Sequence, residues 1–280
     1  MKRTAENYAA LFTEAQGEAQ RIREGVQGYR IKTIHAGDTL EIEGYAIWNT
    51  AKQAGEARRI SEKHREAVRA VNLRNQQKKM RRLVNANFGA GDLFLTLTYD
   101  PEQQPADSTA AQRDIRNYLR RLSRRRERLG LPDLKYIYTT ECTTGVLGTR
   151  YHHHLIVNGG ISRDEAESIW KKGNANSRIC RTDKTGLAGL AHYMTKRKET
   201  QEKARVHGFA CSRNLRKPRI RTADHKIGPA RMARIAEDMQ EHGREILERL
   251  YPGYTCIERP EVHWSPWVAG VYLEARMIKK

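Results

Sequence analysis

Apolar and polar residues alternate along several short stretches of the chain, a pattern that predicts half-buried β-strands. In residues 93–99, three leucines fall on one face and two threonines on the other. Residues 134–141 and 151–158 are predicted as two further strands, and residues 176–181 as a shorter fourth. Three helices are predicted among these strands, at residues 108–129, 162–170 and 186–198. The order strand, helix, strand, strand, helix, strand, helix predicts an α+β fold, with helices packed on one face of a small antiparallel sheet.

The flanking regions have weaker patterns. Residues 29–48 alternate apolar and polar positions around Ala-Gly-Asp, as in a β-hairpin, and residues 53–86 are predicted as one long helix. The remaining predictions are an amphipathic helix at 1–27, a basic loop at 203–221, an amphipathic helix at 232–250 and a strand at 267–277. Three regions are therefore expected: a basic N-terminal extension (1–88), a core α+β domain (89–200) and a basic loop with a helical C-terminal region (201–280).

The composition adds a strong positive charge. The 52 Lys and Arg against 33 Asp and Glu give a net charge of +19 and a pI near 10.0. A field of this sign attracts polyanions, of which nucleic acid fits best. No apolar run is long enough to span a bilayer, and residues 1–20 lack the apolar core of a signal peptide. The four cysteines form no C-x-x-C pair, as expected of reduced thiols. The sequence predicts a soluble cytoplasmic protein with no membrane partner.

A run of three histidines interrupts the strand predicted at 151–158. Successive strand side chains point to opposite faces, so His152 and His154 share one face and His153 lies on the other. Glu141 is the only acidic residue in the predicted hairpin, which would bring it near the two histidines. One carboxylate and two imidazoles suit Mn²⁺ or Mg²⁺, with Mn²⁺ the better match for imidazole. An isolated His-x-His pair is more often structural, so this hypothesis depends on the neighbouring elements.

A candidate nucleophile lies in the helix predicted at 186–198. Tyr193 and Lys196 are three positions apart and share one face of that helix. A phenol with the ordinary tyrosine pKa of about 10 is a weak nucleophile, so attack on a phosphodiester needs a nearby metal ion or cation. Lys196 could provide that charge or bind the transition-state phosphate. Taken singly, Tyr193 fits a core aromatic equally well, and Lys196 is more typical of a solvated surface cation.

In this order the segments resemble the HUH endonucleases, specifically the rolling-circle replication initiators of small phages and plasmids, including the filamentous-phage gene II type. Residues 94–98 are similar to the family's first strand motif, residues 152–157 to its His-x-His metal motif and residues 193–196 to its nucleophile motif. Glu141 stands where the family often has an acidic third ligand, and residues 170–173 fit a Trp-x-x-Gly sequence often seen before the last helix. The resemblance covers about residues 89–200 and implies a ferredoxin- or RRM-like core.

The resemblance implies a replication protein that acts on single-stranded or hairpin DNA at an origin. Tyr193 would attack the backbone to form a 5′-phosphotyrosine and leave a free 3′-OH to prime synthesis, and the reverse reaction would rejoin the strand. A divalent cation, Mn²⁺ or Mg²⁺, would hold and polarise the scissile phosphate. The sequence contains no Walker A loop. A host helicase and polymerase would therefore be partners, in the cytoplasm of a bacterial host cell.

Two positions depart from the family pattern. The middle residue of the metal motif is usually bulky and hydrophobic, and here it is His153. Several relatives carry a second tyrosine in the last motif, whereas Arg197 follows Lys196 here. An enzyme with one tyrosine needs another subunit or another nucleophile to finish a round, so the mode of termination and the oligomeric state stay open.

Basic residues in the flanks are the candidates for contacts with DNA phosphates. They lie in the predicted helix at 53–86 and in the basic segment at 203–221: Arg69, Arg74, Lys78, Lys79, Arg81, Arg82, Arg213, Arg216 and Lys217. Residues 69–82 contain no acidic residue, although such a run fits a solvated helix face equally well. Phosphate contacts position DNA without reading it, so no recognition sequence follows.

Other functions fit the same sequence. A plasmid-mobilisation relaxase or a single-tyrosine transposase would use the same residues for a different purpose. A non-enzymatic nucleic-acid-binding protein would use the sheet as an RNA-recognition-like platform, but the predicted strands lack a dense aromatic set for base stacking. A structural zinc site is a weaker alternative, because no fourth ligand is evident.

Overall fold

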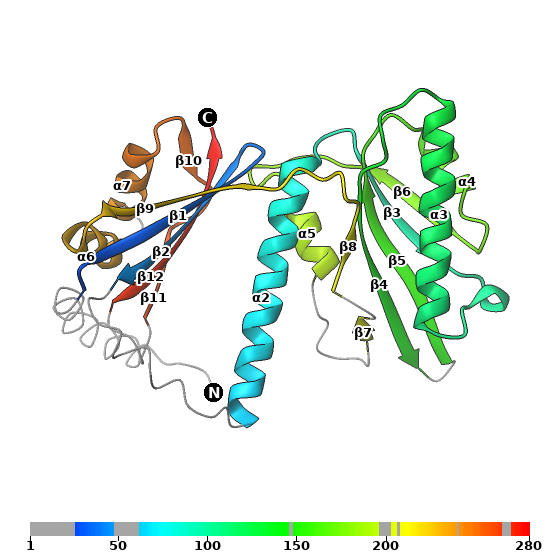
Figure 1. Cartoon of the computed structure of the whole chain (residues 1–280), viewed down its shortest axis with the longest axis horizontal. Helices are drawn as coiled ribbons and strands as arrows, with labels where there is room; N and C mark the ends of the chain where they lie inside the picture. The colour runs from blue at the N-terminus through cyan, green and yellow to red at the C-terminus, as the bar shows by residue number, and fades with distance from the viewer. Residues whose placement is uncertain are drawn as a thin grey trace. The chain divides into compact units, whose positions relative to one another are not determined.

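The computed structural model describes residues 26–47, 62–145, 148–195, 203–205, 208–239, 241–264 and 270–280. It forms two compact units, Met1–Ser61 with Pro218–Lys280 (unit 1) and Glu62–Lys217 (unit 2) (Figure 1). The helix predicted at 1–27 lies outside the described residues except for its last two positions. None of the described helices is long and apolar enough to cross a membrane.

Unit 2 contains an antiparallel sheet with the strand order β6-β3-β5-β4-β7, in which β8 also pairs with β4. Its strands are β3 (Leu93–Thr98), β4 (Tyr136–Gly145), β5 (Gly148–Val157), β6 (Ala175–Ile179), β7 (Lys203–Arg205) and β8 (Ala210–Cys211). Every pairing among these strands is antiparallel. The predicted α+β class with a small antiparallel sheet is therefore confirmed.

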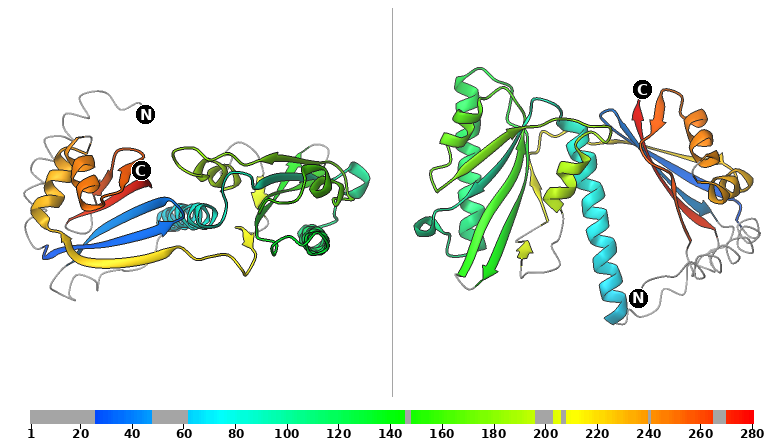
Figure 2. Two further views of the ribbon diagram at one scale, coloured as in Figure 1. Left: turned by 90° about the horizontal axis from the view of Figure 1, so that it is seen from above. Right: turned by 180° about the vertical axis from the view of Figure 1, so that it is seen from behind.

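Helices cover both faces of this sheet, and the prediction that they pack on one face is wrong (Figures 1 and 2). The helices are α2 (Glu62–Asn87), the short 3-10 helix η2 (Pro101–Gln103), α3 (Ser108–Arg128), α4 (Arg163–Ser168) and α5 (Ala188–Thr195). On one face, leucines of β3 and β5 pack with Ile115 and Leu122 of α3. On the other, Phe94 and Ile156 pack with Met80 of α2 and with α5. The face toward α2 and α5 is hard to predict as covered, because its strand residues are apolar at one end of the strands and polar at the other.

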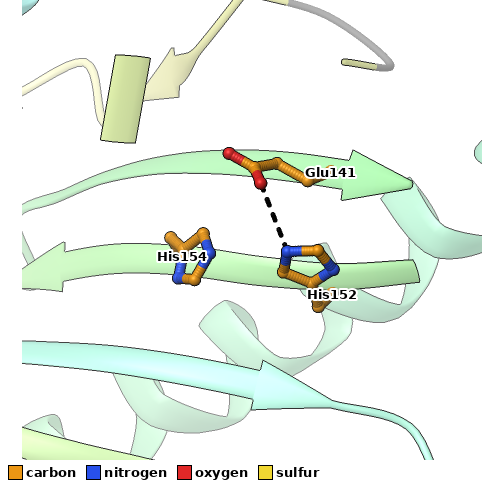
Figure 3. Close-up of side chains that lie close together, drawn as sticks. All are labelled: Glu141, His152 and His154. Atoms are coloured by element: carbon orange, nitrogen blue, oxygen red, sulfur yellow. Dashed lines mark ion pairs between the residues drawn. The ribbon is translucent and has the colours of Figure 1, made fainter. Parts of the chain in front are cut away.

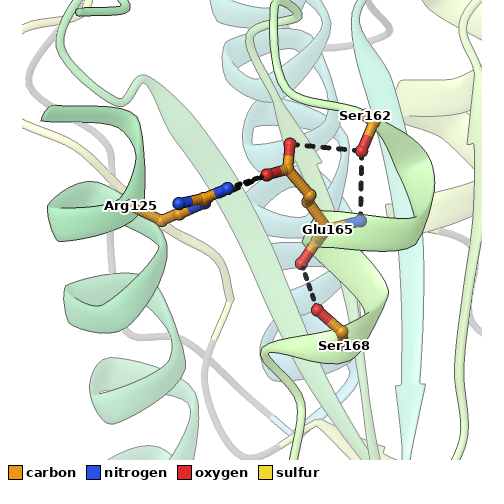
Figure 4. A network of polar contacts seen from close by, with 4 residues as sticks. All are labelled: Arg125, Ser162, Glu165 and Ser168. Atoms are coloured by element: carbon orange, nitrogen blue, oxygen red, sulfur yellow. Dashed lines mark hydrogen bonds and ion pairs between the residues drawn. The ribbon is translucent and has the colours of Figure 1, made fainter. Parts of the chain in front are cut away.

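An ion pair joins the short helix α4 to α3, and capping residues stabilise the N-terminus of α4 (Figure 4). Ser162, the first residue of the helix predicted at 162–170, is the N-cap, and its hydroxyl accepts a hydrogen bond from the Glu165 backbone N–H at 3.2 Å. The Glu165 carboxylate pairs with the Arg125 guanidinium of α3, whose Nε lies 3.0 Å from Oε1. This contact lowers the pKa of the Glu165 carboxyl group.

Unit 1 contains a second antiparallel sheet with the order β10-β12-β2-β1-β9, in which β11 also pairs with β12. Its elements are β1 (Gly28–Ala36), β2 (Thr39–Ile47), β9 (Arg219–Ile227), α6 (Pro229–Glu237), α7 (His242–Leu250), β10 (Tyr254–Cys256), β11 (Glu261–Trp264) and β12 (Val271–Lys279). The predicted hairpin at 29–48 is confirmed as β1 and β2, which turn at Gly37 with a φ of 60°. Met232 and Leu247 of the two helices pack on this sheet.

The C-terminal part of the chain differs from its predicted structure. The single helix predicted at 232–250 is divided into α6 and α7, because the Asp238 carboxylate accepts the Glu241 backbone N–H at 3.0 Å and forms a turn there. The predicted basic loop at 203–221 contains β7, β8 and the start of β9. β9 is an exposed edge strand and therefore needs no apolar pattern. The expected division at residues 88 and 200 follows chain order and does not separate the two units.

The segment at 170–174 in unit 2 is closely attached to the end of β3. The Trp170 indole N–H donates to the Thr98 carbonyl at 2.8 Å, and the Thr98 N–H donates to the Asn174 carbonyl at 2.8 Å. A Cβ atom on Gly173 would lie 2.4 Å from the backbone nitrogen of Asp100. The φ of 139° at Gly173 is also one that other residues rarely adopt. The Trp-x-x-Gly sequence thus has a physical reason, since both residues contact the β3 terminus.

We expect Gly173→Ala to lower the free energy of unfolding by at least about 2 kcal/mol, because it adds backbone strain and a clash with the main chain of β3. Denaturant unfolding of the purified variant measures this. Gly91→Ala is the matched control, because Gly91 has a φ of 89° but no heavy atom within 4 Å of the added Cβ. Equal losses for the two variants would show that the close approach at Gly173 has no effect on stability.

Candidate active site

Glu141, His152 and His154 lie together on one face of the unit 2 sheet (Figure 3). The β4–β5 ladder pairs Glu141 directly with His152, so the two side chains share a face, and His154 follows on the same face two residues later. The Glu141 carboxylate is 3.3 Å from Nε2 of His152. One possible ligand atom from each of the three residues lies within 4.8 Å of the others. The structure therefore brings the predicted metal ligands together.

The surroundings of His154 orient its ring. Oγ1 of Thr96, on the neighbouring strand β3, lies 3.2 Å from Nδ1 of His154. The Phe94 ring is stacked against the imidazole with 5.9 Å between centroids and an interplanar angle of 11°. Nε2 is therefore the nitrogen that His154 would offer to a metal, in the arrangement typical of oriented histidine ligands. Two imidazoles and a carboxylate, one of them already oriented, fit a divalent cation.

His153 points to the opposite face of the sheet, as strand alternation predicts, and is completely buried. Oγ1 of Thr140, which accepts a hydrogen bond from the Gln112 amide at 3.0 Å, lies 2.9 Å from Nδ1 of His153. Nε2 of His153 lies 2.9 Å from the Tyr99 hydroxyl. Both ring nitrogens are thus satisfied, and a histidine replaces the expected hydrophobic residue without leaving a buried polar atom unpaired.

Burial keeps His153 neutral. Desolvation, with a smaller effect from His152 and His154, lowers its pKa from 6.5 to about 3. Burial also raises the pKa of the Tyr99 phenol, as does the neighbouring Asp114 carboxylate. Tyr99 and Thr140 thus contact β5 through His153 on one face of the sheet, while His152 and His154 lie on the face of the candidate site.

Tyr193 lies at the same site, on α5. Its ring makes an edge contact with His154, with centroids 5.2 Å apart, and another with Phe94 at 6.0 Å. The side chain is 50% exposed and so accessible to a substrate. Lys196, one turn further on, lies outside the described residues.

The position of α5 depends on Asn85 of α2, a role that sequence reasoning missed. The Asn85 side-chain oxygen accepts the Leu187 backbone N–H at 2.9 Å, and its nitrogen donates to the Thr185 carbonyl at 3.3 Å. These contacts fix the turn that begins α5. No local pattern identifies Asn85, since its partners are about a hundred residues away. Thr96 was also missed, although strand alternation places it on the face of the histidines.

The predicted DNA-contacting residues have different exposures. Arg74, Lys79, Arg213, Arg216 and Lys217 are exposed, Arg81 and Arg82 are half-buried, and the Arg69 side chain lies outside the description. Lys78 is 9% exposed, which leaves little of its side chain for a phosphate. The Lys79 ammonium lies over the Phe209 ring at 5.9 Å. The exposed residues are the better candidates for phosphate contacts.

Comparison with known proteins identifies the middle of the chain. Residues 92–198 match the family of replication-associated proteins described as ORF2/gene 2 protein. Unit 2 contains a Rep-like domain. Glu141, His152, His154 and Tyr193 all lie within the matched residues, and the resemblance to replication initiators is confirmed.

No curated protein matches the sequence. The solved nuclease domain at the N-terminus of Minute virus of mice non-structural protein-1, which coordinates Zn²⁺ in its active-site pocket and recognises DNA at the replication origin, is 13% identical. The similarity covers 76% of this chain and 91% of that one at a TM-score of 0.17. A TM-score this low establishes no common fold and supports no mechanism.

We expect the free energy of unfolding to fall by about 2 kcal/mol between pH 7 and pH 5 because of His153 alone. His153 is neutral in the folded protein but takes up a proton after unfolding once the pH is below its ordinary pKa of 6.5. Its contribution is therefore complete above that pH and is lost as the pH falls toward 3. Denaturant unfolding of the metal-free protein at both pH values measures the change.

The matched variant is His153→Leu, which has no group to titrate at this position. Its absolute stability is lower because Thr140 and Tyr99 lose their partner, so only the difference between the two pH values is compared. A pH dependence equal to that of the unchanged protein would rule out a buried neutral His153.

Proposed function

We propose that the Rep-like domain nicks and rejoins single-stranded DNA at a replication origin through Tyr193, and so initiates rolling-circle replication of a phage or plasmid. The observation that carries the proposal is the contact between the Tyr193 ring and His154, which belongs to the Glu141–His152–His154 cluster. A half-exposed phenol beside a cluster able to bind a metal is the arrangement that attack on a phosphodiester requires.

In this proposal Glu141, His152 and His154 hold one divalent cation, Mn²⁺ or Mg²⁺. When bound, the cation supplies positive charge that stabilises the scissile phosphate in the transition state. The β4–β5 ladder fixes the spacing between Glu141 and His152, and Thr96 fixes the orientation of His154. The metal ligands therefore need no large rearrangement on binding.

Tyr193 attacks phosphorus in line with the departing 3′ oxygen. The new bond joins the phenolic oxygen to phosphorus, the phosphorus–3′ oxygen bond breaks, and a 5′-phosphotyrosine and a free 3′-OH result. The phenol loses one proton and the 3′ oxygen gains one, so the step is balanced without ATP. Lys196 favours the phenolate or binds the phosphate. The reverse reaction rejoins the strand, and a host polymerase extends the 3′-OH behind a host helicase.

We expect Tyr193→Phe to abolish the covalent protein–DNA adduct, lowering its rate of formation by at least about a thousandfold, because the nucleophilic oxygen is removed. A labelled single-stranded oligonucleotide carrying the hairpin of the protein's own origin is incubated with Mn²⁺ and separated on a denaturing gel. Tyr45→Phe, in unit 1, is the control and should leave the adduct unchanged. Cleavage without an adduct in the Tyr193→Phe variant would indicate hydrolysis and contradict the proposal. Binding without cleavage by the unchanged protein would indicate a non-enzymatic DNA-binding protein.

We expect His152→Ala and His154→Ala each to abolish nicking and Mn²⁺ binding. Thr96→Val should weaken Mn²⁺ binding by about 10–100-fold, because the contact that orients His154 is lost. The electron paramagnetic resonance signal of free Mn²⁺ reports binding without any DNA. His242→Ala, an exposed histidine of unit 1, is the control. Unchanged Mn²⁺ affinity in both histidine variants would show that His152 and His154 are not metal ligands.

A further inference from the structure

A groove of ≈ 620 Å³ lies beside Tyr193 in unit 2. Its walls come from α5, which contributes Leu190 and Tyr193, and from the strand β6 with the residues after it, which contribute Arg178 and Arg181. Phe94 of β3 also lines the groove. The same Phe94 ring contacts both Tyr193 and His154, so the groove and the candidate active site share a wall.

The surface of the groove combines planar and apolar groups with positive charge. The Arg178 guanidinium lies over the Phe94 ring at 4.8 Å, which covers one face of this cation with an aromatic ring. Tyr193 is 50% exposed, which is high for a side chain of its size, and Leu190 adds a half-buried apolar group to the lining. Among the described residues, three arginines and no carboxylate line the groove. One of the three, Arg163, donates to the Ser177 hydroxyl at 3.2 Å and lies 3.8 Å from Glu167, so Arg178 and Arg181 are the main cations.

These groups match the chemistry of a nucleotide. Bases taken out of a stack are bound on aromatic rings and on the planes of arginine guanidinium groups, and their phosphates are bound by further arginines. The groove volume is within the range of about 300–1,000 Å³ typical of small-molecule pockets. A small apolar ligand would not use the arginines, and an inorganic anion would not use the exposed apolar wall.

We propose that this groove binds one unstacked nucleotide of single-stranded DNA next to the phosphate that Tyr193 attacks. The base lies against Arg178 and Leu190, and Arg181 pairs with a neighbouring phosphate. The inference rests on the proposed function, because it places the nucleotide relative to the reaction of Tyr193. In duplex DNA the base is stacked and paired and cannot enter, so the groove provides a preference for single-stranded DNA.

The test measures binding without chemistry, using the full chain in EDTA. Fluorescence anisotropy follows three labelled probes: oligothymidylate of about 20 nucleotides, an abasic strand of the same length, and a duplex of the same length. Such probes exceed the site size of about 4–16 nucleotides that is typical of single-strand grooves. Arg178→Ala should weaken oligothymidylate binding about tenfold, a usual effect of losing one stacked base. Binding of the abasic strand and the duplex should change by less than about twofold.

Two variants separate stacking from charge and from misfolding. Arg178→Lys keeps the charge but loses the plane, so it should bind oligothymidylate nearly as weakly as Arg178→Ala does. Arg124→Ala removes one exposed arginine of α3, on the other face of the sheet, and should not discriminate among the three probes. Full binding by Arg178→Lys, or equal losses on all three probes for Arg178→Ala, would overturn the inference.

Failure of the groove inference and failure of the proposed nicking reaction give different results. Suppose that Arg178→Ala weakens binding of oligothymidylate alone in EDTA, and that the unchanged protein forms no adduct through Tyr193. The groove would then be supported as a nucleotide site, and the nicking reaction would be contradicted. If Arg178→Ala forms the adduct normally and binds single-stranded DNA as the unchanged protein does, the nicking reaction is supported and nucleotide binding in the groove is contradicted.

Discussion

The candidate site depends on the register of the ladder between β4 and β5. Glu141 pairs with His152, and the preceding residue, Thr140, pairs with His153. A slip of one residue would turn every side chain of one strand to the opposite face and separate the carboxylate from the histidines. Such a slip would also break the buried contacts of His153 with Thr140 and Tyr99. The central histidine of the run therefore specifies the position of the other two.

The two faces of the unit 2 sheet explain why a site exists at all. The face toward α3 and α4 is largely apolar, apart from the satisfied His153 network and the buried Ser177, which donates to Glu167. The opposite face is apolar only near Phe94, Ile137 and Ile156, where α2 and α5 cover it. Beyond that cover the strands carry threonines, the two histidines and Glu141. The partly covered sheet thus leaves these polar groups on a rigid surface beside the end of α5. A rigid surface of this kind can hold the side chains of an active site in fixed positions.

Much of this arrangement is predictable from the sequence because it follows from local periodicity. Alternation along β5 fixes which histidines share a face, and the adjacent hairpin strand brings Glu141 to them. Pairings between distant segments are not predictable in this way. β1 pairs with β9 about 190 residues later, and the polar edge strand β9 has no apolar pattern to indicate it. The same limit applies to Asn85 and to the stacking of Arg178 on Phe94, which depend on tertiary neighbours alone.

The placement of Tyr193 shows how tertiary packing controls the chemistry. α5 has only 8 residues, and a helix this short is not stable on its own in water. Its buried residues Ala191 and Met194 pack on the sheet and on α2, and Asn85 of α2 holds the turn that precedes it. The long helix α2 therefore has a structural role on its buried side, whatever its basic residues contact on the other. The distance between Tyr193 and the histidines therefore depends on the buried face of α2, which contacts neither.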